Sequence, residues 1–153
     1  NKSLIYAYYG KKDDLFDRVV ERAFESMHAA VPFAADDIAG YATAHFDYLT
    51  THPDLLRIDA WRRLARPDAT QPEQDAYTEQ VAGFAGVQSA YGVDGQFRPA
   101  DVIIIVIAIA SAWVHAPDGL RPHATQDLTR QRQLVAGAIT VLTKSQQRPR
   151  TTS

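Results

Sequence analysis

Apolar residues recur at intervals of three and four positions along most of the chain, and no stretch alternates apolar and polar residues for long. The first pattern is that of helices with one buried face, whereas strict alternation would indicate strands. The sequence therefore predicts an all-α fold, a helical bundle. We expect a short helix over residues 2–8, followed by six longer ones over residues 13–31, 37–52, 53–66, 73–91, 99–115 and 125–144.

Residues with special backbone preferences mark the ends of these helices. Asp36 or Asp37 is a suitable N-cap, and Pro53 and Pro99 each suit a first helical turn. Gly83 and Gly86 fall inside an expected helix, where each costs ~1 kcal/mol relative to alanine. We therefore expect a neighbouring helix or a ligand to approach closely at these two glycines.

The last two expected helices are unusually apolar. Residues 102–114 are apolar apart from Ser111, but these 13 residues fall short of the ~20 that span a bilayer. A helix that is apolar all round must be covered on every side, and exposing it would favour association. We therefore predict a homodimer in which these helices form a four-helix bundle with their symmetry mates. The expected interface residues are Ile105, Ile109, Leu134, Val135, Ala138, Ile139 and Leu142.

Composition narrows the class of protein. A length of 153 residues suits one compact body, and the absence of cysteine excludes disulfides and thiolate zinc sites and favours a reducing cytoplasm. The net charge of -2 argues against nucleic-acid binding, but three of the four lysines, Lys2, Lys11 and Lys12, precede the first acid, Asp13. A basic head on an acidic body is typical of a DNA reader joined to a separate sensing or dimerising domain.

The opening segment is the most specific motif in the chain. Three aromatic residues lie within four positions and are followed at once by Gly10 and two lysines. Such a segment can pack on one side and touch phosphates on the other, although a surface helix packed on the body would also explain it. The pattern resembles the end of the helix-turn-helix of tetracycline-repressor (TetR) family regulators. The residues that carry this resemblance are Tyr6, Tyr8, Tyr9, Gly10, Lys12, Asp13, Asp14, Leu15 and Phe16.

The resemblance implies roles for individual residues. Tyr6, Tyr8 and Lys12 match positions that contact phosphate, or for Tyr8 a base, while Lys2 and Ser3 match positions that reach base edges or backbone. Leu4 and Lys11 depart from the family pattern, so the base preference cannot be deduced. The implied domains are a partial helix-turn-helix at 1–16, a ligand-binding and dimerisation domain at 17–146 and a disordered tail at 147–153. The family has two more helices before this point, so we expect the chain to be part of a longer one that needs them to bind DNA.

A second candidate site is a cavity between the helices of the body. Such a cavity is the usual place for small-molecule sites in helical bundles, and the resemblance implies a small effector that releases DNA. The apolar and aromatic residues available for the cavity wall suit an apolar or aromatic effector. For each of these residues taken singly, however, a place in the ordinary core is the favoured interpretation. The candidate wall comprises Phe24, Met27, Phe46, Trp61, Tyr77, Phe84 and Trp113, with His28 and His45 as polar contacts.

Enzymatic and metal chemistry find little support. The chain has no nucleophile elbow, phosphate-binding loop, dinucleotide fingerprint or zincin motif. The spacing Glu25-x-x-His28 occurs in di-iron bundles, but those need two such pairs and this chain has one. His45 and His115 lie beside aromatic residues, where a hydrogen-bonded, half-buried imidazole is the simpler interpretation. We therefore expect no metal, no cofactor and no catalytic residue.

The combined prediction is an effector-responsive transcriptional regulator, most simply a repressor. It would bind palindromic double-stranded operator DNA as a homodimer and be released by a small molecule. One alternative is a dimeric helical module that binds a small molecule or a partner without binding DNA. A weaker alternative is a helical enzyme using His45 or His28, which would need a metal or cofactor.

Overall fold

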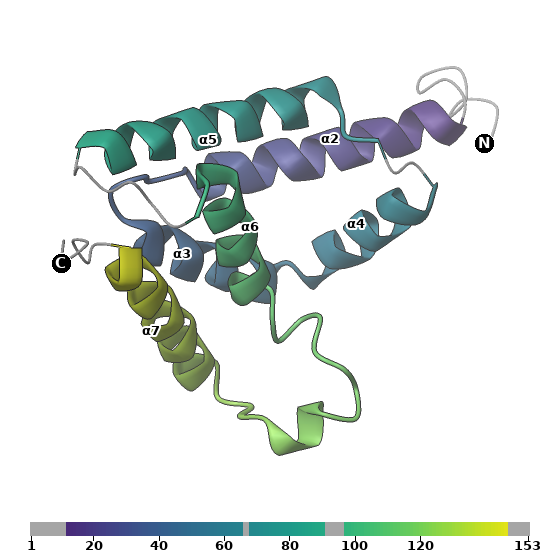
Figure 1. The fold of residues 1–153 in the computed structure, drawn as a ribbon. Coiled ribbons are helices and arrows are strands. Elements are labelled where there is room, and N and C mark those ends of the chain that lie inside the picture. Colours follow the sequence, from purple (N-terminus) through teal and green to yellow (C-terminus); the bar gives the residue numbers. More distant parts are fainter. Residues whose placement is uncertain (1–11, 66–67, 91–96, 147–153) are drawn as a thin grey trace, which may run out of the picture.

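A computed structural model describes residues 12–65, 68–90 and 97–146, and all of its regular elements are helical (Figure 1). This confirms the predicted all-α fold and its six long helices. The helices are α2 (Lys12–Ala30), α3 (Ile38–Thr51), α4 (Pro53–Ala65), α5 (Gln71–Ala90), α6 (Pro99–Ala110) and α7 (Leu128–Gln146), with a short 3-10 turn η1 (Arg121–His123) before α7. The expected helix at 2–8 lies outside the described residues.

Helix α3 is the centre of the bundle, and it packs against α7, α6 and α4. Its predicted apolar face, from Ile38 to Leu49, is buried, and Asp37 caps it by accepting a hydrogen bond of 2.8 Å from the Gly40 amide. Side chains of α3, α5, α6 and α7 meet around it. The core includes Tyr41, Ala42, Phe46, Phe84, Val102, Ile103, Val106, Val135 and Ile139.

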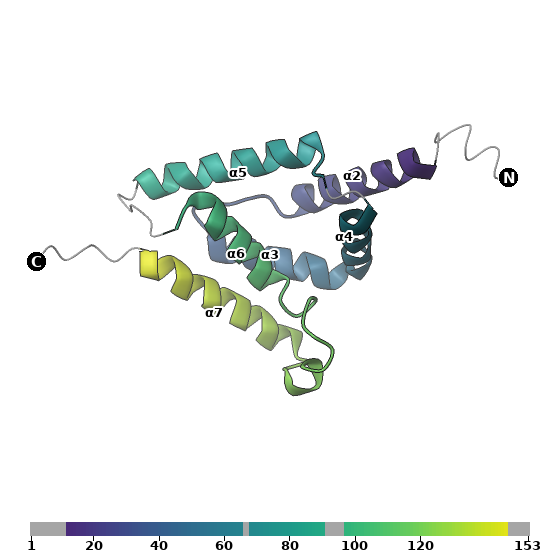
Figure 2. The same ribbon diagram turned by 45° about the vertical axis from the view of Figure 1, so that its right-hand side comes forward.

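Helices α2 and α5 both lie on the side of α3 away from α7 in the two ribbon views (Figures 1 and 2). Phe24 and His28 of α2 place their rings 6.2 and 6.0 Å from the ring of Tyr77 of α5, in edge contacts. Helix α4 approaches the same pair from below in Figure 1. The four helices α2, α3, α4 and α5 therefore surround one region of the molecule.

One expectation about the helices is wrong. Helix α6 ends at Ala110 and not near His115. Ser111 is its C-cap, with a backbone amide that donates to the Ile107 carbonyl at 3.0 Å and a hydroxyl that donates to the same carbonyl at 2.8 Å. The segment between α6 and α7, with η1, then extends away from the bundle in both views (Figures 1 and 2).

At the two glycines of α5, the described residues do not make the close approach that a neighbouring helix was expected to make. A side-chain carbon at Gly86 would meet nothing within 4 Å, and one at Gly83 would make only an ordinary contact of 3.9 Å with Phe33. No described residue therefore comes close enough to either position to require a glycine there.

Candidate ligand-binding cavity

A partly open cavity of about 170 Å³ lies between α2, α3, α4 and α5, and the end of α6 also borders it. Most of its wall is apolar, and one end carries charged side chains. The lining residues are Val20, Glu21, Ala23, Phe24, Met27, His45, Leu49, Leu55, Leu56, Ile58, Asp59, Arg62, Arg63, Thr70, Glu73, Tyr77, Ile107, Ser111 and His115.

Helix α2 supplies one apolar side of this wall. Val20, Ala23, Phe24 and Met27 lie at spacings of three and four, so they share one helix face, and that face borders the cavity. The rings of Phe24 and His28 are in contact, with centroids 3.9 Å apart and planes tilted by 35°, and the His28 Nδ1 lies 3.1 Å from the Phe24 carbonyl oxygen. His28 therefore supports the wall from behind without lining the cavity itself.

His45 of α3 is a buried polar residue in the wall. Burial, reinforced by the charge of His28, lowers the pKa of the His45 imidazole to about 4. The ring is therefore neutral at pH 7, with one nitrogen able to donate and the other able to accept a hydrogen bond. It makes no hydrogen bond with any part of the chain that the structure describes; its ring contact is with Tyr41, 5.9 Å away.

Tyr77 of α5 is the second aromatic residue with a polar atom in the wall. Burial raises the pKa of its phenol, and the carboxylates of Glu73 and Asp59 raise it further. The hydroxyl is therefore protonated at neutral pH. Within the described ranges it has no hydrogen-bond partner.

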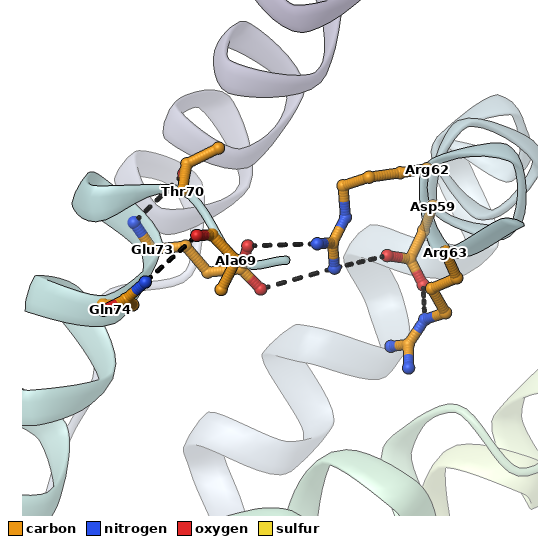
Figure 3. Close-up of polar contacts among 7 residues, drawn as sticks. All are labelled: Asp59, Arg62, Arg63, Ala69, Thr70, Glu73 and Gln74. Carbon is orange, nitrogen blue, oxygen red and sulfur yellow. Dashed lines mark hydrogen bonds and ion pairs between the residues drawn. The ribbon is translucent and has the colours of Figure 1, made fainter. Parts of the chain in front are cut away.

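The charged end of the cavity joins α4 to α5 (Figure 3). Arg62 donates to Asp59 at 3.3 Å on its own helix and pairs with both carboxylate oxygens of Glu73 at 3.4 Å across the gap. Arg63 donates from Nε to Asp59 at 2.8 Å. Arg62 and Glu73 expose only 13% and 15% of their side chains, so the pair is held largely away from water. The two guanidinium charges thus face two carboxylates.

The nine residues expected in a ligand wall fall into three groups. Phe24, Met27, His45 and Tyr77 line the cavity, and His28 supports it. Phe46 and Phe84 belong to the core instead, as does Trp113, whose ring lies 6.3 Å from that of Phe46.

Trp61 is the clearest departure, because it is 69% exposed on α4 and does not reach the cavity. The sequence also did not single out the charged lining residues Asp59, Arg62, Arg63 and Glu73. The crowding of arginines in α4 is visible in the sequence, but their pairing with α5 is not.

The predicted DNA contacts Lys2, Ser3, Tyr6 and Tyr8 lie outside the described residues, while Lys12 is the first residue of α2. Among the predicted interface residues, Leu134 and Ala138 are exposed and Ile105, Ile109 and Leu142 are partly buried. Val135 and Ile139 are instead fully buried in the chain's own core, because they face α3 and not the surface. A partner could not touch these two residues in this arrangement.

Two further features bear on function. The described ranges contain no group of three or more histidine and acidic side chains placed to hold a metal ion. In the same ranges, no helix has the length and apolarity needed to cross a membrane.

Comparison with known proteins assigns the body of the chain. Residues 37–140 match the family model described as "Tetracyclin repressor-like, C-terminal domain". The chain is 33% identical over 121 residues to the HTH-type transcriptional repressor SCO4008 of Streptomyces coelicolor. That match covers 76% of this chain but only 63% of the relative's length.

The fold is also shared with a solved structure. The crystal structure of SCO4942 from Streptomyces coelicolor, a proposed transcriptional regulator, superimposes with a TM-score of 0.79 at 23% identity, covering 93% of this chain and 79% of that one.

Proposed function

Because the chain belongs to the tetracycline-repressor family, we propose that it is the sensing and dimerising part of a transcriptional repressor whose hold on DNA is controlled by a small molecule. The observation that carries this proposal is the position of the cavity. It lies directly against α2, the helix that follows the opening segment, which resembles the DNA-reading motif of the family. The ligand and the DNA-binding segment would thus both contact the same helix, α2.

The proposed mechanism is a shift between two populated states. A ligand that packs against Val20, Phe24 and Met27 stabilises the orientation of α2 that best fits the ligand. In a dimer, a changed α2 would move the two reading helices away from the ~34 to 36 Å separation of successive major grooves. Lys2, Ser3, Tyr6, Tyr8 and Lys12 would supply the DNA contacts that are then lost.

The homodimer of this proposal would form on α6 and α7. Ile104 and Val141 expose 64% and 71% of their surface, and Leu134 is 40% exposed. Burying each large apolar side chain contributes about 1.5 to 3 kcal/mol, so covering this face with a second copy is favourable. Two helices from each protomer would then form the four-helix interface.

DNA selection tests the regulatory function. The product of the complete gene is used to enrich binding sites from random double-stranded DNA, and we expect a palindromic motif. Lys12→Ala should then weaken binding to every site and lower the salt dependence by roughly 0.9 per lost phosphate contact in a log-log plot. Lys144→Ala, at the far end of the chain in α7, is the matched control.

Failure to enrich any motif would favour the alternative, a ligand-binding or partner-binding module without DNA binding. An unchanged salt slope for Lys12→Ala would remove Lys12 from the DNA contacts.

A further inference from the structure

The cavity wall contains two polar groups whose hydrogen-bonding capacity the described protein leaves unused. They are the imidazole of His45 on α3 and the hydroxyl of Tyr77 on α5. Both side chains are mostly buried, and neither hydrogen-bonds to another described residue. Among the described residues, the only fully buried side-chain polar atom without a hydrogen-bond partner is Gln80 Oε1, so the polar atoms of His45 and Tyr77 remain accessible from the cavity. A ligand that hydrogen-bonds to both should bind more tightly than one that bonds to neither.

The protonation states define what such a ligand must offer. The neutral imidazole can accept one hydrogen bond, and the protonated phenol can donate one. A hydroxyl group on the ligand provides the complementary pair, because it donates one hydrogen bond and accepts another. The remaining wall, with Phe24, Met27, Leu49 and Ile107, suits an apolar ring.

The charged end of the cavity argues against an ionic ligand. Arg62 is already paired with Glu73 and Asp59, and Arg63 with Asp59. Glu21, the remaining charged lining residue, is exposed to solvent. A charged ligand would lose its hydration without finding an unpaired, buried opposite charge.

The cavity volume limits the size of the ligand. About 170 Å³ is close to the ~150 Å³ of an engineered apolar cavity in another protein that holds one benzene molecule. One ring with one or two small substituents therefore fits without rearrangement of the wall.

We infer that the effector is a neutral single-ring compound with a hydroxyl group, an alkylphenol in its simplest form, whose hydroxyl hydrogen-bonds to His45 and Tyr77. This inference rests on the proposed function, in which the same cavity controls DNA binding. It specifies the chemical class of the ligand.

Calorimetric titration of the chain with four one-ring probes tests the class of ligand. p-Cresol has the ring and hydroxyl, toluene lacks the hydroxyl, and benzoate and benzylamine carry a charge. We expect p-cresol to bind about tenfold more tightly than toluene, and both ions to bind more weakly than p-cresol. Equal affinity for toluene and p-cresol, tighter binding of either ion, or no binding of p-cresol would overturn the inference.

Two variants identify the groups that recognise the hydroxyl. Tyr77→Phe removes only a hydroxyl from the wall, and His45→Leu removes the imidazole. Each should reduce the preference for p-cresol over toluene about three- to tenfold. The controls delete the same groups outside the cavity: Tyr48→Phe, where the hydroxyl lies 3.1 Å from Ser26 Oγ, and His52→Leu at an exposed histidine.

An unchanged preference in both cavity variants would overturn the assignment even if p-cresol binds. These results are independent of DNA selection by the complete gene product. If the probes do not show the expected preference, the proposed role in transcriptional regulation is unaffected. If DNA selection yields no operator, the measured preference for p-cresol is likewise unaffected.

Discussion

The imidazole of His45 makes the stability of the fold depend on pH. Its pKa is about 4 in the folded chain, against an ordinary value near 6.5 in the unfolded chain. The unfolded state therefore binds the proton more readily between these values, and stability falls as the pH falls below 6.5. We expect the free energy of unfolding to drop by about 2 kcal/mol between pH 7 and pH 5 from this group alone.

Urea unfolding of the wild type and of His45→Leu at pH 7, 6 and 5 isolates this contribution. The difference between the two proteins should change by the stated amount, because other titrating groups are common to both. Parallel pH profiles for wild type and His45→Leu would show that the imidazole is not held neutral by the fold.

The Arg62–Glu73 pair connects α4 to α5 and should matter for stability. Removing one partner of a largely buried ion pair leaves the other charge without compensation. Because some solvent reaches this pair, we expect Arg62→Met to destabilise the chain by about 2 to 3 kcal/mol in urea unfolding. Glu73→Gln should have a similar effect, since it leaves Arg62 with Asp59 alone.

Arg57 on the same helix provides the comparison. Its contact with Asp54 is 3.9 Å long, and both side chains are more than four-fifths exposed, at 85% and 87%. Arg57→Met should therefore change stability by less than about 0.5 kcal/mol. A similar small effect for Arg62→Met would mean that the network does not hold the two helices together.

At the scale of single helices, two glycines should respond in opposite ways to alanine. Gly86→Ala places a methyl group in open space on α5 and should stabilise the chain by about 0.5 to 1 kcal/mol. Gly40→Ala would place its Cβ 2.7 Å from Cγ of Asp37, disturbing the N-cap of α3. Thermal unfolding should therefore show no gain or a loss for Gly40→Ala, because a lost cap costs about 1 kcal/mol. Equal gains at both sites would contradict the role of the cap.

The positions of the helices could be predicted from the sequence because their breakers are local. Asp37, Pro53 and Pro99 act through their own backbone or the first helical turn, and the observed helices begin at or next to them. The end of α6 could not be predicted in the same way. Ser111 caps the helix, but serine also occurs inside helices, and the apolar pattern continues beyond it to Val114.

The cavity could be predicted only in part, for a related reason. Periodicity identified the inward faces of α2 and α3, so Phe24, Met27 and His45 were placed near one another. Helix α4 has no clear apolar face, since Trp61 and Leu64 are exposed while Arg62 is largely buried. Its charged residues acquire a common environment only when α5 brings Glu73 opposite them, and sequence periodicity carries no such information.

At the scale of the whole molecule, the proposed function gives different roles to the exposed face of α6 and α7 and to the cavity. Helix α3 packs against α6 and α7 on one side, and its His45 and Leu49 border the cavity on the other. Association through the exposed Ile104 and Val141 would leave α2 free to respond to a ligand, although α6 also borders the cavity through Ile107. In the proposed mechanism, a ligand changes the orientation of α2 while the two chains stay associated, and this arrangement is compatible with that requirement.

The proposed dimer is tested by placing a charge on this face. Ile104→Glu and Val141→Glu should each convert the dimer to a monomer in light-scattering or sedimentation measurements, because a carboxylate buried against an apolar partner surface loses its hydration. Helix content should persist, since both positions are mostly exposed within one chain. Leu64→Glu is the matched control, because Leu64 is 88% exposed on α4. If the chains still associate with either substitution on α6 and α7 but not with Leu64→Glu, the interface lies on α4 instead.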